Sequence, residues 1–141
     1  MALQQVRAER TGWRDQALSE RHRQWGFNCP MVDVDWLAIE YDEGRAMALV
    51  EYKHERAEIQ WANHPSYRAL CDLGNRAGVP VFAVRYAEDF SWWRVTALNA
   101  TGRAFVPQRV DLTEEEYVAL LYRVRGRTMP ADLFVNLTQS V

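Results

Sequence analysis

The sequence predicts an α/β domain in which a central mixed β-sheet is flanked by helices. Short apolar segments typical of strands alternate with amphipathic segments typical of helices, which is the pattern of this fold class. The nearly continuous apolar run over residues 79–84 is typical of a strand covered on both faces, as in parallel or mixed sheets. A length of 141 residues suits one domain, so we expect residues 1–141 to fold as a single domain.

The first half of the chain predicts a charged helix followed by a hairpin. Residues 12–25 carry side chains at helical spacing and are followed by Gly26, which predicts a helix that ends there. Residues 31–41 and 45–53 have the composition of strands. The short connection at residues 42–44 contains glycine, which favours a hairpin between the two strands.

A second helix and a third strand follow. Residues 66–77 predict a helix with Ser66 as its N-cap and Gly78 in the position of a C-cap glycine. We expect this helix to lead into the strand at 79–84. Its predicted buried face consists of the apolar side chains Leu70, Cys71, Leu73 and Ala77.

The last part of the chain predicts a second hairpin and a final helix. Residues 91–98 and 103–106 predict two further strands around a turn at 101–102. Thr113 with Glu116 three positions later matches a capping box, so we expect a helix to begin there and to end before Gly126.

Composition limits the class of protein. No apolar run approaches the length of a membrane span and no secretory signal is recognisable at the start of the chain, so we expect a cytoplasmic protein without membrane contact. Cys29 and Cys71 lack zinc-ligand spacing and predict two reduced, packed thiols. No glycine-rich phosphate loop occurs, so we expect no nucleotide cofactor. A net charge of −2 argues against a protein that coats nucleic acid by bulk electrostatics.

Acidic side chains accumulate at one end of the predicted hairpin. Asp33 and Asp35 lie at the start of its first strand, and Glu51 and Lys53 end its second strand. Because side chains alternate along a strand, Glu51 and Lys53 share a face, as do Asp33 and Asp35. If the strands pair, the acids can converge, and carboxylate oxygens are the ligands that Mg²⁺ prefers.

This arrangement resembles the PD-(D/E)XK nuclease superfamily. The likeness rests on an acid followed by apolar residues at 35–39, a hairpin, the sequence Glu51-Tyr52-Lys53 after an apolar strand, and then a helix and a strand. It covers roughly residues 13–87. Val34 stands where the family has proline, which leaves open whether Asp33 or Asp35 is the principal acid; we favour Asp35, because the apolar run begins directly after it. The resemblance implies a restriction-endonuclease-like αβββαβ core, as in small Holliday-junction resolvases and in phage or restriction endonucleases.

The resemblance also implies a mechanism. Asp35, Glu51 and the backbone carbonyl of Tyr52 would hold Mg²⁺ or Mn²⁺, and Lys53 would orient water and help neutralise the phosphate. The catalytic residues of this metal-dependent DNA endonuclease, a hydrolase of phosphodiester bonds, would then be Asp35, Glu51 and Lys53. By family analogy, Glu20 on the first helix and Gln60 after the lysine are additional candidates, and Asp33 is a possible second metal ligand. DNA is the implied partner, and a homodimer is the implied assembly.

Basic residues form two clusters. Arg21, His22 and Arg23 are weak candidates for nucleic-acid contacts. A second cluster near the last helix has two explanations, because cations there complement the helix dipole as well as DNA; it consists of Arg123, Arg125 and Arg127. Glu40 falls on the opposite face from the candidate acids by parity and is set aside.

Two alternatives to an enzyme remain. A catalytically inactive nuclease-like scaffold could bind nucleic acid or a protein, with the acids serving structure. A phage or mobile-element accessory protein could bind a partner through the aromatic region around Phe90, Trp92 and Trp93. The sequence does not distinguish junction, specific-site, flap, single-stranded or RNA substrates.

Overall fold

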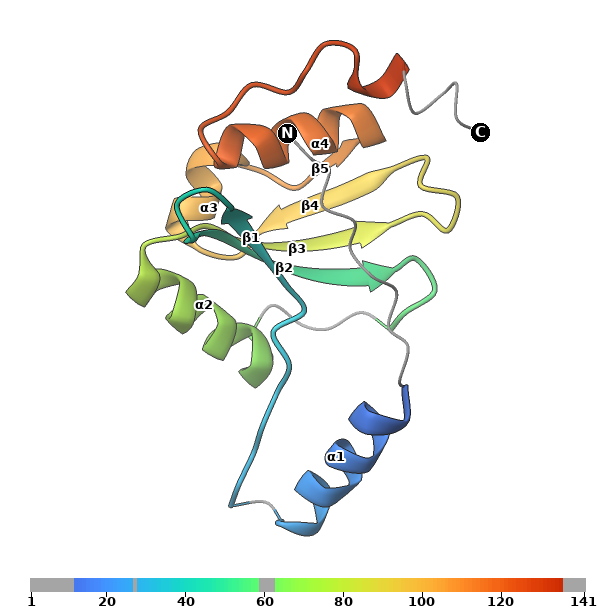
Figure 1. Cartoon of the computed structure of the whole chain (residues 1–141), viewed down its shortest axis with the longest axis vertical. Coiled ribbons are helices and arrows are strands. Elements are labelled where there is room, and N and C mark those ends of the chain that lie inside the picture. Colours follow the sequence, from blue (N-terminus) through green and yellow to red (C-terminus); the bar gives the residue numbers. More distant parts are fainter. Residues whose placement is uncertain (1–11, 27, 59–62, 136–141) are drawn as a thin grey trace. The chain divides into compact units, whose positions relative to one another are not determined.

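The computed structural model describes residues 12–26, 28–58 and 63–135. The chain divides into two units, Met1–Asp33 and Val34–Val141. The first contains helix α1 (Gly12–Gln24), as the helical spacing predicted; the second contains the remaining elements (Figure 1). None of the helices in the described residues is long and apolar enough to cross a membrane.

The second unit is built on a five-stranded mixed sheet, which confirms the predicted fold class. Its strands lie in sequence order, and only β2 and β3 run parallel. The strands are β1 (Trp36–Glu40), β2 (Arg45–His54), β3 (Val81–Tyr86), β4 (Trp93–Ala97) and β5 (Val110–Leu112). The helices of this unit are α2 (Pro65–Ala77), α3 (Ala100–Phe105) and α4 (Glu114–Val124).

The first hairpin forms where it was predicted, with a shorter first strand. Gly44 adopts φ 62° in the turn, a conformation that favours glycine, and its N–H donates to the Tyr41 carbonyl at 3.2 Å. The ladder ends at the pair of Trp36 and Val50. Residues 31–35 were predicted to belong to the first strand, but they lie outside it. They gain little from burial, since Met31 is 67% exposed. Two strands therefore lie between α1 and α2 in the described residues, not the three of an αβββαβ order.

Helix α2 forms as predicted but differs in its cap and its buried face. His64 is the N-cap, because its Nδ1 accepts the N–H of Ser66 at 3.2 Å, and Ser66 lies inside the first turn. Gly78 is the left-handed C-cap, as expected. Leu73 and Ala77 were predicted to be buried, but both are exposed, Leu73 at 45%. The packing centres on Gly74 instead, where a Cβ would lie 2.2 Å from a methyl group of Val81, so only glycine permits this close approach.

The predicted second hairpin is wrong. Residues 100–105 form helix α3, and β4 pairs with β5. The reason is the buried Asn99, whose Oδ1 accepts the N–H groups of Gly102 at 2.8 Å and Val81 at 3.0 Å. This side chain caps the helix and ties it to β3, which outweighs the strand propensity of the segment.

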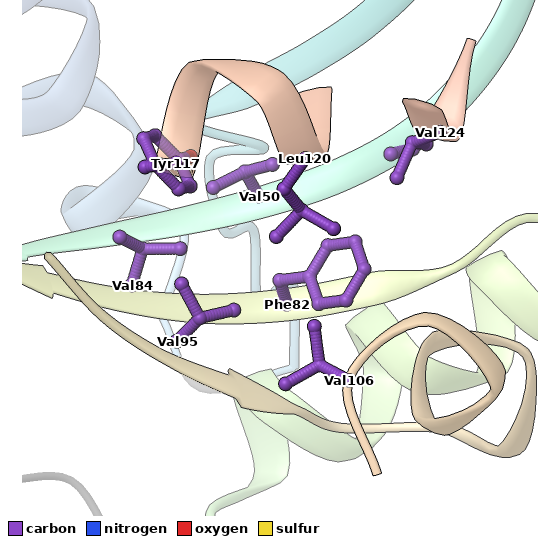
Figure 2. Packing of buried hydrophobic residues seen from close by; sticks show 9 residues of the cluster. Val50, Phe82, Val84, Val95, Val106, Tyr117, Leu120 and Val124 are labelled. Carbon is purple, nitrogen blue, oxygen red and sulfur yellow. The ribbon is translucent and has the colours of Figure 1, made fainter. Parts of the chain in front are cut away.

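Each face of the sheet carries its own apolar core. On one face, α4 packs Tyr117, Leu120 and Val124 over the sheet, around the fully buried Phe82 (Figure 2). The predicted capping box of α4 is present, with Thr113 and Glu116 bonded reciprocally. On the other face, Leu70 of α2 belongs to a smaller cluster; its members are Leu49, Leu70, Val79 and Val81. The helices α2 and α4 therefore cover opposite faces (Figure 1).

The two thiols differ from the prediction in part. Cys71 packs against the smaller core and donates to the Leu98 carbonyl at 3.2 Å, as expected for a structural thiol. Cys29, in the first unit, is exposed and free. Asn28 and Pro30 on either side of it are exposed as well.

Candidate functional site

Strand β2 carries the candidate site on the face that α2 covers. Leu49 belongs to the smaller core with Leu70 of α2, so alternation places Glu51 and Lys53 on the same face. Tyr52 points to the opposite face, where its hydroxyl lies 2.6 Å from that of Tyr117. The apolar strand thus ends in two ionisable side chains at the margin of a core.

Asp35 lies against Glu51. The last ladder pair joins Trp36 to Val50, so the next position toward the N-terminus is opposite Glu51. The pKa of Glu51 is raised above its usual range by burial first, then by the charge of Asp35 and a hydrogen bond between their side chains. The two carboxyl groups that the sequence predicted to converge are therefore brought together.

Lys53 completes this group. Its Nζ lies 3.4 Å from Glu51 Oε1, and the Glu51 side chain is 16% exposed against 32% for Lys53. Lys53 lowers the pKa of Glu51, but burial and Asp35 together outweigh it. With both acids ionised, the group carries two negative charges and one positive charge. That surplus, in a partly buried place, favours an additional cation.

The Tyr52 carbonyl is directed to the same side as Asp35. Along a strand, the N–H and C=O of one residue point to the same neighbouring strand, and the direction alternates. The Leu49 N–H donates to the Pro80 carbonyl on the β3 side, so the backbone groups of Tyr52 face the β1 side. Tyr52 lies two residues beyond Val50, the last β2 residue paired with β1. Its carbonyl therefore points to the stretch of chain just before Trp36, where Asp35 lies.

Tyr67 of α2 is a site residue that the sequence did not reveal. It is buried, and burial is the main cause that raises the pKa of its hydroxyl. Lys53, Glu51 and Asp35 all act on that hydroxyl electrostatically, so it lies within reach of their charges. The available signal was the helical spacing of Tyr67, Leu70 and Gly74, which marks one face of α2.

Lys53 is also distinctive in composition. It is the only lysine in the chain, beside sixteen arginines. An ammonium group is a compact point charge with rotatable donors, whereas guanidinium is a planar fork. The candidate site therefore holds the one ammonium side chain of the sequence.

The structure does not test the remaining candidates, which belong to the first unit or lie outside the described residues. Glu20 and Asp33 belong to the first unit, where both are exposed and Glu20 accepts a bond from Gln16 at 3.4 Å. Gln60 lies outside the described residues. The basic cluster of Arg21, His22 and Arg23 forms the last turn of α1, also in the first unit. The roles of these residues stay predictions.

A second charged group occupies the other end of the hairpin. Glu40, which parity had set aside, is only 4% exposed and accepts Arg127 twice, at 2.8 and 3.1 Å. Arg125 also donates to it, at 3.4 Å. The hydrogen bond from Arg127 is the main cause that lowers the pKa of Glu40. Two of the three arginines of the second basic cluster therefore hold the hairpin, which accounts for them without DNA.

Among residues 12–26, 28–58 and 63–135, no group of three or more His, Cys, Asp or Glu side chains is placed to hold a metal ion. The candidate site offers two carboxylates and a carbonyl, which suits Mg²⁺, an ion that commonly takes one or two protein carboxylates and completes its shell with water. Comparison with known proteins adds no family: no protein-family model, curated protein or solved structure matches this chain.

Proposed function

We propose that this protein is a metal-dependent nuclease that hydrolyses phosphodiester bonds in DNA. The observation that carries the proposal is the position of Glu51, which is partly buried between the carboxylate of Asp35 and the ammonium of Lys53. Such perturbed carboxyl groups concentrate at functional sites, because a structural acid gains more from full neutralisation.

In this proposal, Asp35, Glu51 and the Tyr52 carbonyl hold Mg²⁺ or Mn²⁺. The repulsion that raises the pKa of Glu51 is what a divalent cation would relieve, so the donor set fits the ion. When bound there, the cation would lower the pKa of a water molecule and offset negative charge on the phosphate.

The protein's own groups perform the remaining work. In this proposal, Lys53 orients the attacking water and donates to a phosphate oxygen as negative charge develops. Its contact with Glu51 limits the positions its ammonium can take. Tyr67 is a further donor from the helix above the strand, and its raised pKa keeps its hydroxyl protonated at neutral pH.

The topology supports the proposal without establishing it. The antiparallel β1–β2 hairpin, helix α2 and the parallel strand β3 follow one another in the order expected for the later part of a restriction-endonuclease-like core. We include that core in the proposal. Its first strand has no counterpart among the described residues, and a pair of sites in a homodimer is likewise part of the proposal only.

The single lysine makes the metal site testable directly. Labelling with ¹⁵N-lysine gives one backbone amide signal, from Lys53. We expect substoichiometric Mn²⁺ to broaden this signal and Asp35→Asn to abolish the broadening. The matched control is Asp111→Asn, which removes an acid from the exposed pair with Arg94. An unbroadened Lys53 signal in the wild type would exclude a metal at this place.

Cleavage tests the enzymatic claim. We expect Mn²⁺- or Mg²⁺-dependent cleavage of branched, linear or single-stranded DNA that is lost in Lys53→Ala while the circular dichroism spectrum is retained. A non-enzymatic scaffold that binds DNA is the second candidate, favoured by the small number of acidic donors at the site. DNA binding without cleavage under any of these metal conditions would support that candidate.

A further inference from the structure

Aromatic rings form a continuous stack at the β3–β4 end of the sheet. Phe90, Trp93 and Tyr117 follow one another with nearly parallel planes, at 5.7 Å and 15° and then at 4.8 Å and 8°. Tyr86 joins the stack from β3, with its ring 6.0 Å from that of Phe90 and 5.7 Å from that of Trp93. The inner end of the stack is the buried Tyr117, and its outer end is Phe90.

Phe90 is placed there against the preference of its backbone. Its φ of 62° is the only positive value at a non-glycine residue in the described part of the chain. A bulky side chain in this conformation is strained, and such strain is concentrated where a protein holds a ligand. The N–H of Phe90 donates to Ala87 at 2.9 Å and its carbonyl accepts Trp93 Nε1 at 3.1 Å, so the residue is held firmly. Yet its side chain is 49% exposed.

The stack adjoins the candidate nuclease site. In the parallel pairing of β2 and β3, Lys53 is the partner of Arg85 and His54 is the partner of Tyr86. The His54 ring lies edge-on to that of Tyr86, 5.5 Å away. A polynucleotide passing around the carboxyl ends of these two strands would therefore meet Lys53 on one face and the stack on the other.

The loops beyond these strands are fastened to each other. Arg85 donates to the carbonyls of Glu55 and Ala57, and Glu55 accepts the N–H of Glu88 at 2.9 Å. The distance between the end of β2 and the turn that carries Phe90 is thereby fixed.

We propose that the outer face of Phe90 binds an unpaired nucleobase, and that the substrate is single-stranded or carries unpaired nucleotides beside the cleavage point. The proposal rests on the proposed nuclease function. A flat ring backed by parallel rings offers one open π-face, and bases of any sequence stack on such a face. Parallel rings leave no cage for a rounded cation, which would need walls on several sides.

Charges around the turn favour an unpaired strand over a duplex. Glu88 and Asp89 directly precede Phe90 in the sequence and are exposed. Glu88 is paired with Arg56 at 3.1 Å, while the charge of Asp89 stays on the turn and its pKa is lowered by bonds from Ser91. A duplex can reach Phe90 only with its phosphates close to these acids. An unpaired base can project onto the ring while its phosphates stay farther away.

The test measures binding of a fluorescent single-stranded DNA oligonucleotide by anisotropy, in EDTA and again in Ca²⁺. We expect Phe90→Leu, which keeps an apolar side chain but removes the π-face, to weaken binding about tenfold. An abasic oligonucleotide of equal length has phosphates without bases, so the same variant should bind it as the wild type does. Phe90→Trp should retain or increase the affinity for the oligonucleotide with bases.

The matched control is Leu73→Ala, which removes a comparably exposed apolar side chain from α2 and should leave binding unchanged. Phe90→Gly guards against a purely structural effect: it relieves the strained backbone, so the turn should form while binding of the single strand falls. Equal affinity of wild type and Phe90→Leu for the oligonucleotide would overturn the proposal. So would a preference for duplex, or binding of an arginine-rich peptide in place of DNA.

The two proposals fail separately. A Lys53 signal that Mn²⁺ does not broaden in the wild type would refute the metal site, while base stacking is measured in EDTA and needs no metal. Conversely, metal-dependent cleavage with no effect of Phe90→Leu on binding or on the choice between single strand and duplex would leave the nuclease intact and refute the stacking site.

Discussion

The β1–β2 hairpin has a carboxylate at each end, buried at Glu40 and partly buried at Glu51, and the two differ in the charges that surround them. Glu40 lies between two arginines, and the hydrogen bond from Arg127 is the main cause that lowers its pKa. Glu51 has one ammonium and a neighbouring acid, and burial followed by Asp35 raises its pKa. Both acids belong to the same pair of strands, so the difference is not one of secondary structure. It comes from which side chains the tertiary fold brings to each end.

This comparison separates a structural acid from a candidate functional acid. The fold neutralises Glu40 with a bidentate guanidinium, a geometry suited to holding a carboxylate in place. At Glu51 the fold leaves negative charge uncompensated, which costs stability and is tolerated where a ligand supplies the missing charge. Substitutions at Glu40 should therefore lower stability and leave activity unchanged, whereas substitutions at Glu51 should lower activity and raise stability.

The largest expected effect is on catalysis. Lys53→Ala should lower kcat/KM for DNA cleavage about a hundredfold or more, because it removes a donor aimed at developing phosphate charge. Arg127→Ala, at the other end of the hairpin, should leave cleavage per folded molecule unchanged. Steady-state kinetics on both purified variants measures this, and equal losses of activity would remove the distinction between the ends.

The next effect is on stability at the structural end. Glu40→Gln should lower the midpoint of thermal unfolding clearly, since it breaks the bidentate contact and leaves two guanidinium groups without their acid. Asp111→Asn, in the exposed pair with Arg94, should change the midpoint much less. Differential scanning calorimetry of the two variants ranks them, and a larger loss in Asp111→Asn would contradict the assignment.

The opposite sign is expected at the candidate site. Glu51→Gln should impair cleavage and raise the free energy of unfolding at neutral pH by about 1 kcal/mol, the size of a relieved repulsion between partly exposed charges. A gain in stability together with a loss of function is typical of an active-site residue. Urea unfolding provides the measurement; a destabilised Glu51→Gln would indicate that its bond to Lys53 is chiefly structural.

The dependence on pH sharpens the contrast. The pKa of Glu40 is below its ordinary value of 4.5 in the folded state, so its stabilisation is present above that value and is lost as pH falls through the lowered pKa. Glu51 titrates above 4.5, so its protonated form stabilises below that value and this contribution is lost as pH rises through the raised pKa. Unfolding curves of Glu40→Gln should therefore approach the wild type in acid, and those of Glu51→Gln should diverge from it as pH rises.

The smallest effect is expected at Tyr67. Tyr67→Phe keeps the buried ring and removes only the hydroxyl, so cleavage should fall about fivefold, the size of one neutral hydrogen bond, with little change in stability. Tyr122→Phe, on α4 at the opposite face of the sheet, is the matched control. A thermal midpoint that falls with unchanged cleavage would reassign Tyr67 to structure.

Local signals accounted for the elements that formed as predicted. Thr113 and Glu116 specify their helix start within four residues, and Gly78 specifies a helix end in the same way. Glu51 and Lys53 share a face because strand geometry allows nothing else. Errors arose where a distant group decides. Residues 103–106 have strand propensity, but the hydrogen bond from Val81 N–H to Asn99 holds the segment as a helix instead. Leu73 has an apolar side chain at helical spacing, but Gly74 makes the close contact with β3.

The sequence by itself determined the alternation of strands and helices, the hairpin, and the presence of two acids and a lysine at one of its ends. Only the tertiary structure decided that Asp35 meets Glu51, that Tyr67 joins them, and that Glu40 is neutralised by Arg125 and Arg127. The physical reason is range. Backbone conformation follows from neighbours a few residues apart, whereas the charge balance at a carboxylate depends on groups that folding brings from far along the chain.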